Sequence, residues 1–276
     1  MPSPLELPEA PVPLDAGQAI SAIARYYELD FGHLHEDIEL YANLASGLAT
    51  RTSILELGAG TGRVAAALAD RGADVTAVEN NDAMIAAGAE RFQAAGVDVV
   101  QQDMRQLDVG AERFDLVICA LSSFCHMETR ADQLATLRSA RRALAPQGQL
   151  ILDLPALSAE DWEEGPRPLL HEWTRRHPIS GRDVTKLASL VAHPASQIQD
   201  VTYIYDEARA DGSVERTIAR FPLRHVFRFE VVGLLEAAGM HVTNCYGSYD
   251  LAAVEAGQRL IVLARSRTLA RKDTTE

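Results

Sequence analysis

Short apolar runs alternate with helical patterns between residues 53 and 160. The apolar runs are 54–57, 74–79, 97–102, 114–120 and 149–154. Apolar residues at three- and four-residue spacing fill 63–69, 82–94 and 130–143, whereas 104–107 has room for at most a short helix. A parallel sheet needs this alternation because a crossover must return the chain to the same edge. The pattern therefore predicts an α/β fold.

The alternation stops after residue 160. Residues 186–192, 199–208 and 214–220 have the pattern of antiparallel strands, with Asp211-Gly212 as the turn between the last two. A helix over 230–238 and strands over 241–246 and 259–264 follow. We therefore expect a Rossmann-like, doubly wound, seven-stranded sheet that is mostly parallel with an antiparallel last strand. An antiparallel sheet is inserted before its sixth strand.

A glycine-rich turn follows the first predicted strand. Gly58, Gly60 and Gly62 stand where the strand gives way to a helix, and glycine allows positive φ and close approach of a ligand. A dinucleotide-binding turn has the spacing G-x-G-x-x-G and needs its third glycine for close packing of the helix. Arg63 occupies that position here. The spacing therefore disfavours a nicotinamide cofactor, although the turn still predicts a nucleoside-type ligand.

Two acidic residues follow the next two strands. Glu79 ends strand 74–79, about 20 residues beyond the first glycine, where a carboxylate can accept both ribose hydroxyls. Asp103 follows strand 97–102 and can accept a hydrogen bond from an adenine amino group, with Met104 packing on the ring. Either acid alone fits a helix cap or a solvated loop equally well. Their combination with the glycines favours an adenosine site.

These segments resemble the class I S-adenosylmethionine-dependent methyltransferases. Within that class the chain is similar to small-molecule N-methyltransferases of the glycine and amino-sugar types. The resemblance covers roughly residues 16–265. It rests on the residues of 55–63 (LELGAGTGR), 79–84 (ENNDAM), 102–104 (QDM), 114–118 (FDLVI) and 144–150 (LAPQGQL).

The resemblance implies S-adenosyl-L-methionine as the cofactor and assigns roles to individual residues. Glycine-turn residues line its methionine portion, Glu79 takes the ribose, and Asp103 takes the adenine amino group. Arg63 helps to hold the carboxylate, and Tyr27 covers the methionine end; a tyrosine that packs an amphipathic helix against the sheet is the alternative for Tyr27. The expected cofactor site is Tyr27, Glu56, Gly58, Ala59, Gly60, Gly62, Arg63, Glu79, Asn80, Met84, Asp103, Met104, Ala120 and Leu121.

The acceptor side carries no motif that identifies the acceptor. His126 follows the fourth strand and is either a general base or a structural histidine in the first turn of the next helix. Ser123, Trp173, Arg224 and Tyr246 are expected to line the acceptor pocket. Because no dedicated base stands out, we expect methyl transfer to nitrogen rather than to oxygen, on a small-molecule acceptor.

Composition narrows the possible partners. A net charge of −13 argues against a nucleic acid or an anionic membrane as partner, because phosphate binding needs a basic face. The three cysteines form no C-x-x-C pair, and no metal-ligand cluster is recognisable. The N-terminus lacks a secretory leader pattern, so we expect a cytoplasmic enzyme. Composition leaves the oligomeric state open.

The chain is expected to be organised around the cofactor. Two further functions stay open at this point: a non-catalytic protein that binds the cofactor or a protein partner through the inserted sheet, and a nicotinamide-dependent oxidoreductase. The expected parts are an extended or disordered arm 1–15 with five prolines, helices in 16–50 that cover the cofactor, the cofactor-binding core 51–160, the inserted sheet 161–224 as an acceptor lid, the completion of the core 225–266, and a tail 267–276.

Overall fold

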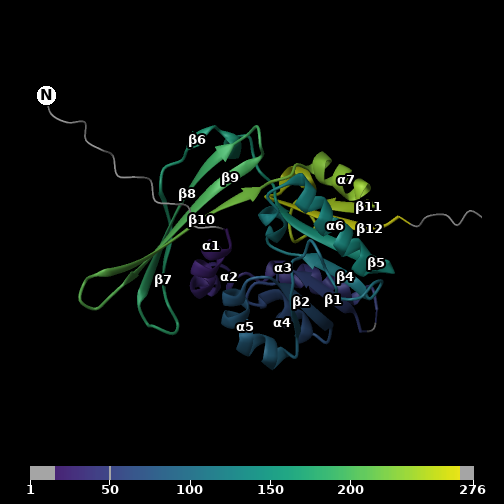
Figure 1. The fold of residues 1–276 in the computed structure, drawn as a ribbon, viewed down its shortest axis with the longest axis horizontal. Coiled ribbons are helices and arrows are strands. Elements are labelled where there is room, and N and C mark those ends of the chain that lie inside the picture. Colours follow the sequence, from purple (N-terminus) through teal and green to yellow (C-terminus); the bar gives the residue numbers. More distant parts are fainter. Residues whose placement is uncertain (1–15, 50, 268–276) are drawn as a thin grey trace, which may run out of the picture.

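The larger of two sheets has seven strands in the order β11-β12-β5-β4-β1-β2-β3 (Figure 1). The computed structural model describes residues 16–49 and 51–267. β12 runs antiparallel to β5 and β11. The pairs β1–β2, β1–β4, β2–β3 and β4–β5 are all parallel, which confirms the predicted fold class. The bounds are β1 Ser53–Leu57, β2 Asp74–Glu79, β3 Asp98–Gln101, β4 Phe114–Cys119, β5 Leu144–Pro155, β11 Met240–Tyr246 and β12 Arg259–Ser266.

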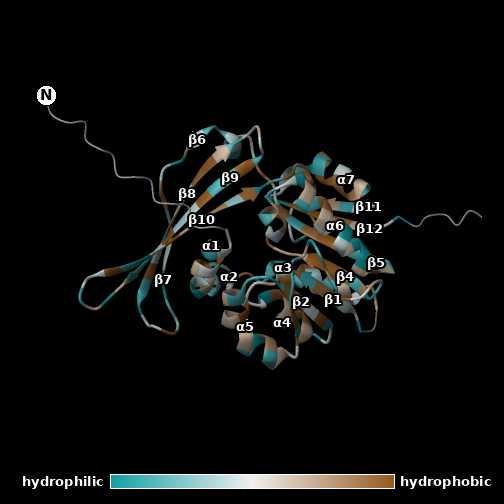
Figure 2. Ribbon diagram, in the orientation of Figure 1, coloured by the Kyte–Doolittle hydropathy of each residue, from teal (hydrophilic) through white to brown (hydrophobic). Residues whose placement is uncertain are grey.

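Helices cover both faces of this sheet. Side chains alternate between the faces, so Ile54 of β1 packs in one apolar cluster while Leu55 and Leu57 pack in the other. The first cluster includes side chains of α3, α4 and α5, and the second includes side chains of α6 and α7. Figure 2 shows the central strands as largely hydrophobic. The bounds are α3 Glu36–Ser46, α4 Arg63–Ala69, α5 Asp82–Ala95, α6 Arg130–Ala143 and α7 Arg228–Ala237.

The first part of the helical region expected over 16–50 is broken into three short pieces. It consists of α1 Ala16–Ile23, the 3-10 turn η1 Ala24–Tyr26 and α2 Tyr27–Phe31. The tighter turn sends two consecutive tyrosines to different surfaces. Tyr26 stacks on Tyr205 of the inserted sheet with 4.5 Å between ring centroids, whereas Tyr27 lies beside the glycine turn.

The inserted sheet has the strand order β10-β9-β8-β6, with β7 paired to β8, and all its pairs are antiparallel. Gly212 at the β9–β10 turn has a φ of +83°, as the predicted Asp-Gly hairpin requires. The sequence did not predict β6 or β7, because most side chains of β7 are exposed and show no apolar alternation. The bounds are β6 Gly165–Pro166, β7 Leu170–Arg176, β8 Asp183–His193, β9 Ile198–Ala208 and β10 Val214–Arg224.

The inserted sheet stands beside the larger sheet, and α1 and α2 lie between them (Figure 1). Ala19 and Tyr26 of the N-terminal segment share an apolar cluster with Val201, Tyr205 and Phe221 of the inserted sheet. The N-terminal helices therefore pack against the inserted sheet as well as against the core. The predicted arm 1–15 and residues 268–276 of the tail lie outside the described residues.

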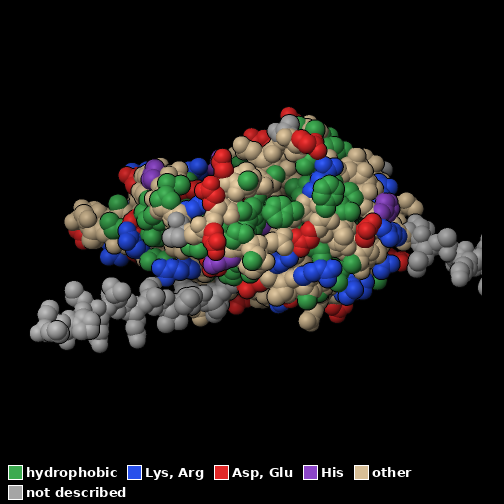
Figure 3. All heavy atoms as spheres, turned by 90° about the horizontal axis from the view of Figure 1, so that it is seen from above, with side chains coloured by type: hydrophobic (Ala, Val, Ile, Leu, Met, Phe, Trp, Pro, Cys, Tyr) green, Lys and Arg blue, Asp and Glu red, His purple; other side chains and the backbone are tan. Residues whose placement is uncertain are grey.

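The surface mixes both signs of charge. On the face seen from above in Figure 3, acidic and basic side chains are interspersed around hydrophobic ones. Two exposed phenylalanines, Phe227 and Phe229, lie where α7 begins, and Phe229 is 84% exposed. Among the described helices none has both the length and the apolar character needed to span a membrane.

Candidate functional site

A cavity of about 1230 Å³ opens at the carboxyl ends of β1, β2 and β4, where an open α/β sheet binds its ligand. Its other walls come from α1, α2 and the inner face of the inserted sheet. Eleven of the predicted site residues line it from at least five separate segments. These are Tyr27, Gly58, Gly60, Glu79, Asn80, Met84, Asp103, Met104, Leu121, Ser123 and His126.

The three glycines of the turn all have positive φ but serve different surfaces. Gly58 and Gly60 line the cavity, and a Cβ on Gly58 would lie 2.9 Å from the Cβ of Ser123. Gly62 instead faces Phe92, whose ring would lie 2.2 Å from an added Cβ. Any side chain at Gly58 would therefore intrude on the cavity wall, whereas one at Gly62 would separate α4 from α5.

Glu79 ends β2 and holds the glycine turn in place. Its Oε2 accepts a hydrogen bond from the Gly60 N–H at 2.8 Å. Its Oε1 accepts from the N–H groups of Asn80 and Asn81 at 2.9 Å and 2.8 Å. A carboxylate has about four acceptor positions, so one remains for a ligand hydroxyl. Glu79 therefore orients the glycine turn, a role that the sequence did not predict.

Asp103 and Met104 border the same end of the cavity. Arg105 donates to both oxygens of Asp103, and this hydrogen bonding lowers the pKa of the carboxyl below its usual range. Asp103 is therefore an anion that can accept a hydrogen bond from an amino group. The Cε of Met104 lies 3.4 Å from the position of a Cβ on Gly58, which places its thioether against the turn.

Tyr27 closes the cavity above the glycine turn. Its ring carbon Cζ and hydroxyl oxygen both lie 3.5 Å from the position of a Cβ on Gly60. Burial raises the pKa of Tyr27 well above its usual range, so the phenol stays neutral. Its neighbour Glu28 pairs with Arg91 at 2.7 Å and accepts from Thr61 at 2.5 Å, which fastens α2 to the turn.

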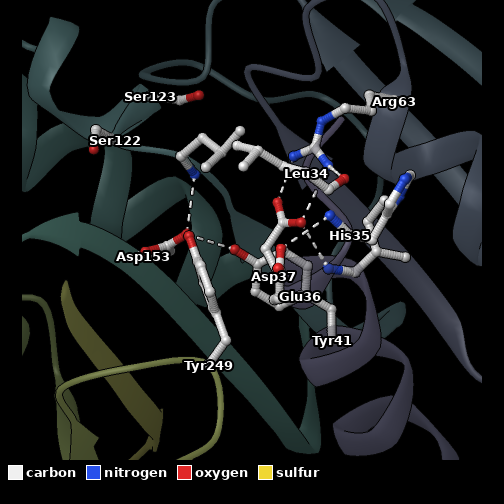
Figure 4. A network of polar contacts seen from close by, with 12 residues as sticks. Leu34, His35, Glu36, Asp37, Tyr41, Arg63, Ser122, Ser123, Asp153 and Tyr249 are labelled. Atoms are coloured by element: carbon white, nitrogen blue, oxygen red, sulfur yellow. Dashed lines mark hydrogen bonds and ion pairs between the residues drawn. The ribbon is translucent and has the colours of Figure 1, made fainter. Parts of the chain in front are cut away.

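Arg63 and Glu56 lie behind the turn rather than among the residues that line the cavity. Arg63 donates to the Leu34 carbonyl at 2.9 Å and to both oxygens of Asp37 (Figure 4). Burial raises the pKa of Glu56 to about 8. Arg63 Nε and Glu56 Oε2 are buried without a hydrogen-bond partner among the described residues. The structure therefore shows the guanidinium paired with Asp37, and the role toward the cofactor carboxylate that the resemblance implies stays a prediction.

The loop after β4 forms the end of the cavity nearest the inserted sheet. Leu121 and Ser122 have φ of +43° and +67°, a strained conformation for residues with side chains. Hydrogen bonds from the N–H groups of Leu121 and Ser122 to Asp153 hold this loop, and Ser123 Oγ donates to the Gly58 carbonyl at 3.3 Å. The strain therefore coincides with the wall of the cavity.

His126 lies in the 3-10 helix η2 Ser123–His126, which ends before α6 begins at Arg130. The prediction that places it in the first turn of α6 is therefore wrong. Its ring lies 5.6 Å from that of Phe221 across the cavity. Burial lowers the pKa of His126 to about 4, so the imidazole is neutral at pH 7 and is a weak base.

A buried polar network that the sequence reasoning missed supports this loop. Asp153 of β5 is fully buried and accepts from Tyr41 at 2.7 Å and Tyr249 at 2.9 Å (Figure 4). Arg259 donates to its other oxygen from Nε at 2.8 Å and also lines the cavity. The available signal was an aspartate inside the apolar run 150–154, because a buried charge needs a partner.

Three predicted acceptor-site residues have other partners. Trp173 donates to Asp30 at 3.0 Å, and Arg224 pairs with Glu230 at 2.7 Å beneath the inserted sheet. Tyr246 packs against the apolar cluster under α3 and α4. Of the cofactor-site residues, Ala59, Gly62 and Ala120 pack into the core. The cavity is lined instead by Glu172, Ala188, Leu190, Gln199, Val201, Tyr203, Phe221 and Leu223 of the inserted sheet.

The cavity fits the cofactor that the resemblance implies. Two glycines leave the floor open where a Cβ would intrude, Glu79 and Asp103 supply acceptors, and Tyr27 and Met104 supply flat or polarisable surfaces. Within residues 16–49 and 51–267 no group of three or more histidine, cysteine, aspartate or glutamate side chains is arranged to hold a metal ion.

Comparisons with known proteins agree with this geometry. Residues 54–148 match the model of a methyltransferase domain. The chain is 32% identical over 215 residues to a cypemycin N-terminal methyltransferase from Streptomyces sp, a match that covers 77% of this chain and 83% of that protein. It is 29% identical over 112 residues to the putative methyltransferase YqeM of Bacillus subtilis, and 35% identical over 105 residues to a glycine/sarcosine N-methyltransferase of Halorhodospira halochloris. These two matches cover 40% and 37% of this chain and only 45% and 39% of those proteins.

Two solved structures share the fold. The CcbJ methyltransferase of Streptomyces caelestis superposes with a TM-score of 0.79 at 22% identity, covering 92% of this chain and all of that one. The sugar N-methyltransferase KedS8 of Streptoalloteichus has a TM-score of 0.71 at 23% identity, covering 88% and 92%. Both likenesses include the inserted sheet region as well as the core, because the coverage exceeds the length of the core.

The oxidoreductase and the non-catalytic alternatives are thereby excluded, and S-adenosylmethionine is the cofactor. The glycine turn, the acidic strand ends, the matched domain and the long match to the cypemycin enzyme lead to the same conclusion: the chain belongs to the S-adenosylmethionine-dependent methyltransferase family.

Proposed function

We propose that this methyltransferase acts on a nitrogen of a small-molecule amine. The observation that carries the proposal is the state of His126, the imidazole between the post-β4 loop and the inserted sheet. With a pKa lowered to about 4, it holds no proton at pH 7 and has little capacity to take one from a hydroxyl group. An unprotonated amine needs no base before it attacks a methyl group, so this environment suits nitrogen better than oxygen.

Relatives support the proposal without deciding it. By name, the glycine/sarcosine enzyme is an N-methyltransferase and the cypemycin enzyme an N-terminal methyltransferase, whereas a ubiquinone biosynthesis O-methyltransferase from Pseudomonas paraeruginosa is 30% identical over 131 residues. That last match covers 45% of this chain and 54% of the relative. Because both chemistries occur among the relatives, the preference for nitrogen rests on the residues of the cavity.

The chain's own residues then have the following roles. Bound S-adenosylmethionine supplies an activated methyl group on sulfur. Glu79 orients the glycine turn and accepts from the ribose, and Asp103 accepts from the adenine amino group. Tyr27 covers the turn and, with the inserted sheet, keeps water from the reacting atoms. These groups bind and align two reactants, which is the main requirement for a direct methyl transfer.

We also propose that the reaction takes place in the cytoplasm. Cys119, Cys125 and Cys245 are free in the structure, and the first two are buried. Unpaired thiols of this kind are typical of a reducing compartment.

The test is an acceptor panel with the full chain. Primary and secondary amines and their hydroxyl analogues of the same shape are incubated with S-adenosylmethionine, and S-adenosylhomocysteine release and the gain of a methyl group are measured by mass spectrometry. We expect transfer to amines, faster as the pH rises toward the pKa of the amine. Transfer to the hydroxyl analogues alone would contradict the proposal.

A further inference from the structure

The inner face of the inserted sheet forms the wall opposite the glycine turn. Its side chains alternate along β8, β9 and β10, and those that line the cavity are mainly apolar or aromatic. Tyr203 and Phe221 meet edge to face with 5.4 Å between ring centroids, and Phe221 also contacts the ring of His126. This part of the cavity therefore offers a surface that suits the apolar or aryl part of an acceptor.

One acidic side chain reaches this surface because of an irregularity in β7. Leu170 and His171 pair with Ala188 and Leu187, but Trp173 pairs with the next residue, Lys186, so Glu172 is an extra residue in the strand. Such a bulge changes the direction of a side chain relative to regular alternation. Trp173 donates to Asp30 and packs against the apolar cluster on the inner side of the sheet, and its neighbour Glu172 lines the cavity. In a regular strand these two neighbours would face opposite sides.

The cationic side chains near this wall of the cavity, Lys186 and Arg259, pair with carboxylates other than Glu172. Lys186 pairs with Asp30 at 2.8 Å, and Arg259 pairs with Asp153 at 2.5 Å. His126 is neutral at pH 7. Within the described part of the chain, the Glu172 carboxylate forms no ion pair or hydrogen bond, although its charge acts on Tyr203 and Tyr205 and helps to keep both phenols protonated.

We propose that Glu172 is a specificity-determining residue that selects an acceptor with a protonated nitrogen over neutral or anionic molecules of the same shape. A carboxylate on the cavity wall is a suitable receptor for an ammonium group because of its charge, whereas the Tyr203 ring of the same wall already has Lys186 Nζ 3.8 Å from its centroid. This inference rests on the proposed function, because it concerns the acceptor of the same cavity. It names that acceptor's class: an amine with an apolar or aryl body that arrives as an ammonium ion and loses its proton to solvent beside the exposed Glu172 carboxylate, before the freed electron pair on nitrogen attacks the methyl group.

The test measures binding, so that it does not depend on turnover. Tyramine, tyrosol and 3-(4-hydroxyphenyl)propionate share one aryl body and end in a cationic, a neutral and an anionic group. Their dissociation constants are measured by ligand-observed NMR on the full chain saturated with S-adenosylhomocysteine at pH 7.5. Because Glu172 is exposed to solvent, we expect wild type to prefer tyramine to tyrosol by only about threefold to tenfold.

Two substitutions and a matched control isolate the carboxylate. Glu172→Gln should abolish the preference, and Glu172→Lys should reverse it toward the anionic compound. Glu164→Gln changes an exposed glutamate of the same region that does not line the cavity, and should keep the wild-type preference. An unchanged melting temperature and S-adenosylhomocysteine affinity would show that the variants are folded.

Equal binding of the three compounds by wild type, no detectable binding of tyramine, or a preference that survives in Glu172→Gln would overturn the inference. The two proposals fail in different ways. A Glu172-dependent preference without methyl transfer to any amine would contradict the proposed function alone. Methyl transfer to amines with no effect of Glu172 on charge preference would contradict the inference alone.

Discussion

The parallel core and the cover over it are held together by different forces. We use "cover" for α1, η1 and α2 together with the inserted sheet. In the core, β1, β4 and β5 are apolar on both faces, and their side chains interlock with helices on each side. The cover has one small apolar cluster and depends on buried polar contacts between segments more than 150 residues apart in sequence.

Asp30 shows how the cover is joined. Its carboxylate, buried beneath the inserted sheet, receives Lys186 Nζ at 2.8 Å, the Tyr205 hydroxyl at 2.5 Å and the Trp173 indole N–H at 3.0 Å. Arg25 makes a second link, to the buried Glu207 at 2.6 Å. The two segments of the cover are therefore bonded to each other in one orientation.

Apolar packing in the core and polar contacts in the cover have different roles. Apolar packing stabilises the core, and the backbone of the glycine turn shapes the part of the cavity that borders it. Directional hydrogen bonds and ion pairs add geometric specificity, and in the cover they set where Tyr27 and Glu172 stand over the cavity. We therefore expect polar substitutions to affect the cover and steric ones to affect the core.

The largest expected effect comes from breaking the cover's buried ion pair. Lys186→Met leaves Asp30 buried without its cation, which costs about 3–5 kcal/mol in comparable buried pairs. The free energy of unfolding from urea titration and hydrogen exchange in α2 measure the effect. Asp30→Asn combined with Lys186→Met removes both charges and should recover part of the loss. A Lys186→Met variant as stable as wild type would show that the pair does not hold the cover.

A steric change should have the next largest effect, in the core. Gly62→Ala puts a methyl group against Phe92 and adds the strain of positive φ, whereas Gly72→Ala adds the strain alone because nothing lies within 4 Å. Overpacking of this kind costs typically 1–3 kcal/mol, so Gly62→Ala should be less stable than Gly72→Ala by about that amount. Urea titration of both variants gives the difference. Equal stability would mean that α4 and α5 move apart at no cost.

Cofactor affinity tests whether residues of the core, such as Glu79, determine how tightly the cofactor binds. Glu79→Ala removes the acceptor of the Gly60 N–H and of the proposed ribose contact, so we expect the dissociation constant of S-adenosylhomocysteine to rise by about 10- to 100-fold. Isothermal titration calorimetry measures it, with Glu90→Ala on the exposed side of α5 as the control. If Glu79→Ala bound as tightly as the control, Glu79 would have no place in the site.

A pH dependence of stability is also expected in the core. Burial raises the pKa of Glu56 from 4.5 to about 8, so the folded state favours the protonated carboxyl. Its contribution is complete below about pH 4.5 and is lost as the pH rises toward 8. Glu56→Gln should remove this part of the slope in unfolding free energy between pH 5 and pH 9. The slope of Glu90→Gln should match wild type, and an unchanged slope in Glu56→Gln would contradict the assignment.

Local patterns were sufficient for the core. Strand β2 and helices α4 and α6 have the predicted bounds, because their ends coincide with glycine turns and with caps such as Thr129. The glycine spacing and the acids after β2 and β3 predicted a cofactor edge that the structure places around one cavity. Parallel strands bring their carboxyl ends to the same edge whatever the rest of the chain does.

The sequence did not predict the contacts between segments that are distant along the chain. Arg63 pairs with Asp37, Trp173 donates to Asp30 and Arg224 pairs with Glu230, because a polar group that is removed from water binds an acceptor that lies near it in the fold. Arg259 reached the cavity through Asp153 for the same reason. Sequence spacing carries no information on which partner is near.

By itself, the sequence determined the fold class, the cofactor and the edge of the sheet where it binds, since these depend on periodicity and on residues within one turn of each other. Only the tertiary structure decided which side chains of the inserted sheet line the cavity. A one-residue bulge in β7 and ion pairs spanning more than 100 residues set those directions. Such features arise when sheets and helices pack, because burial then forces each charged group to find its partner.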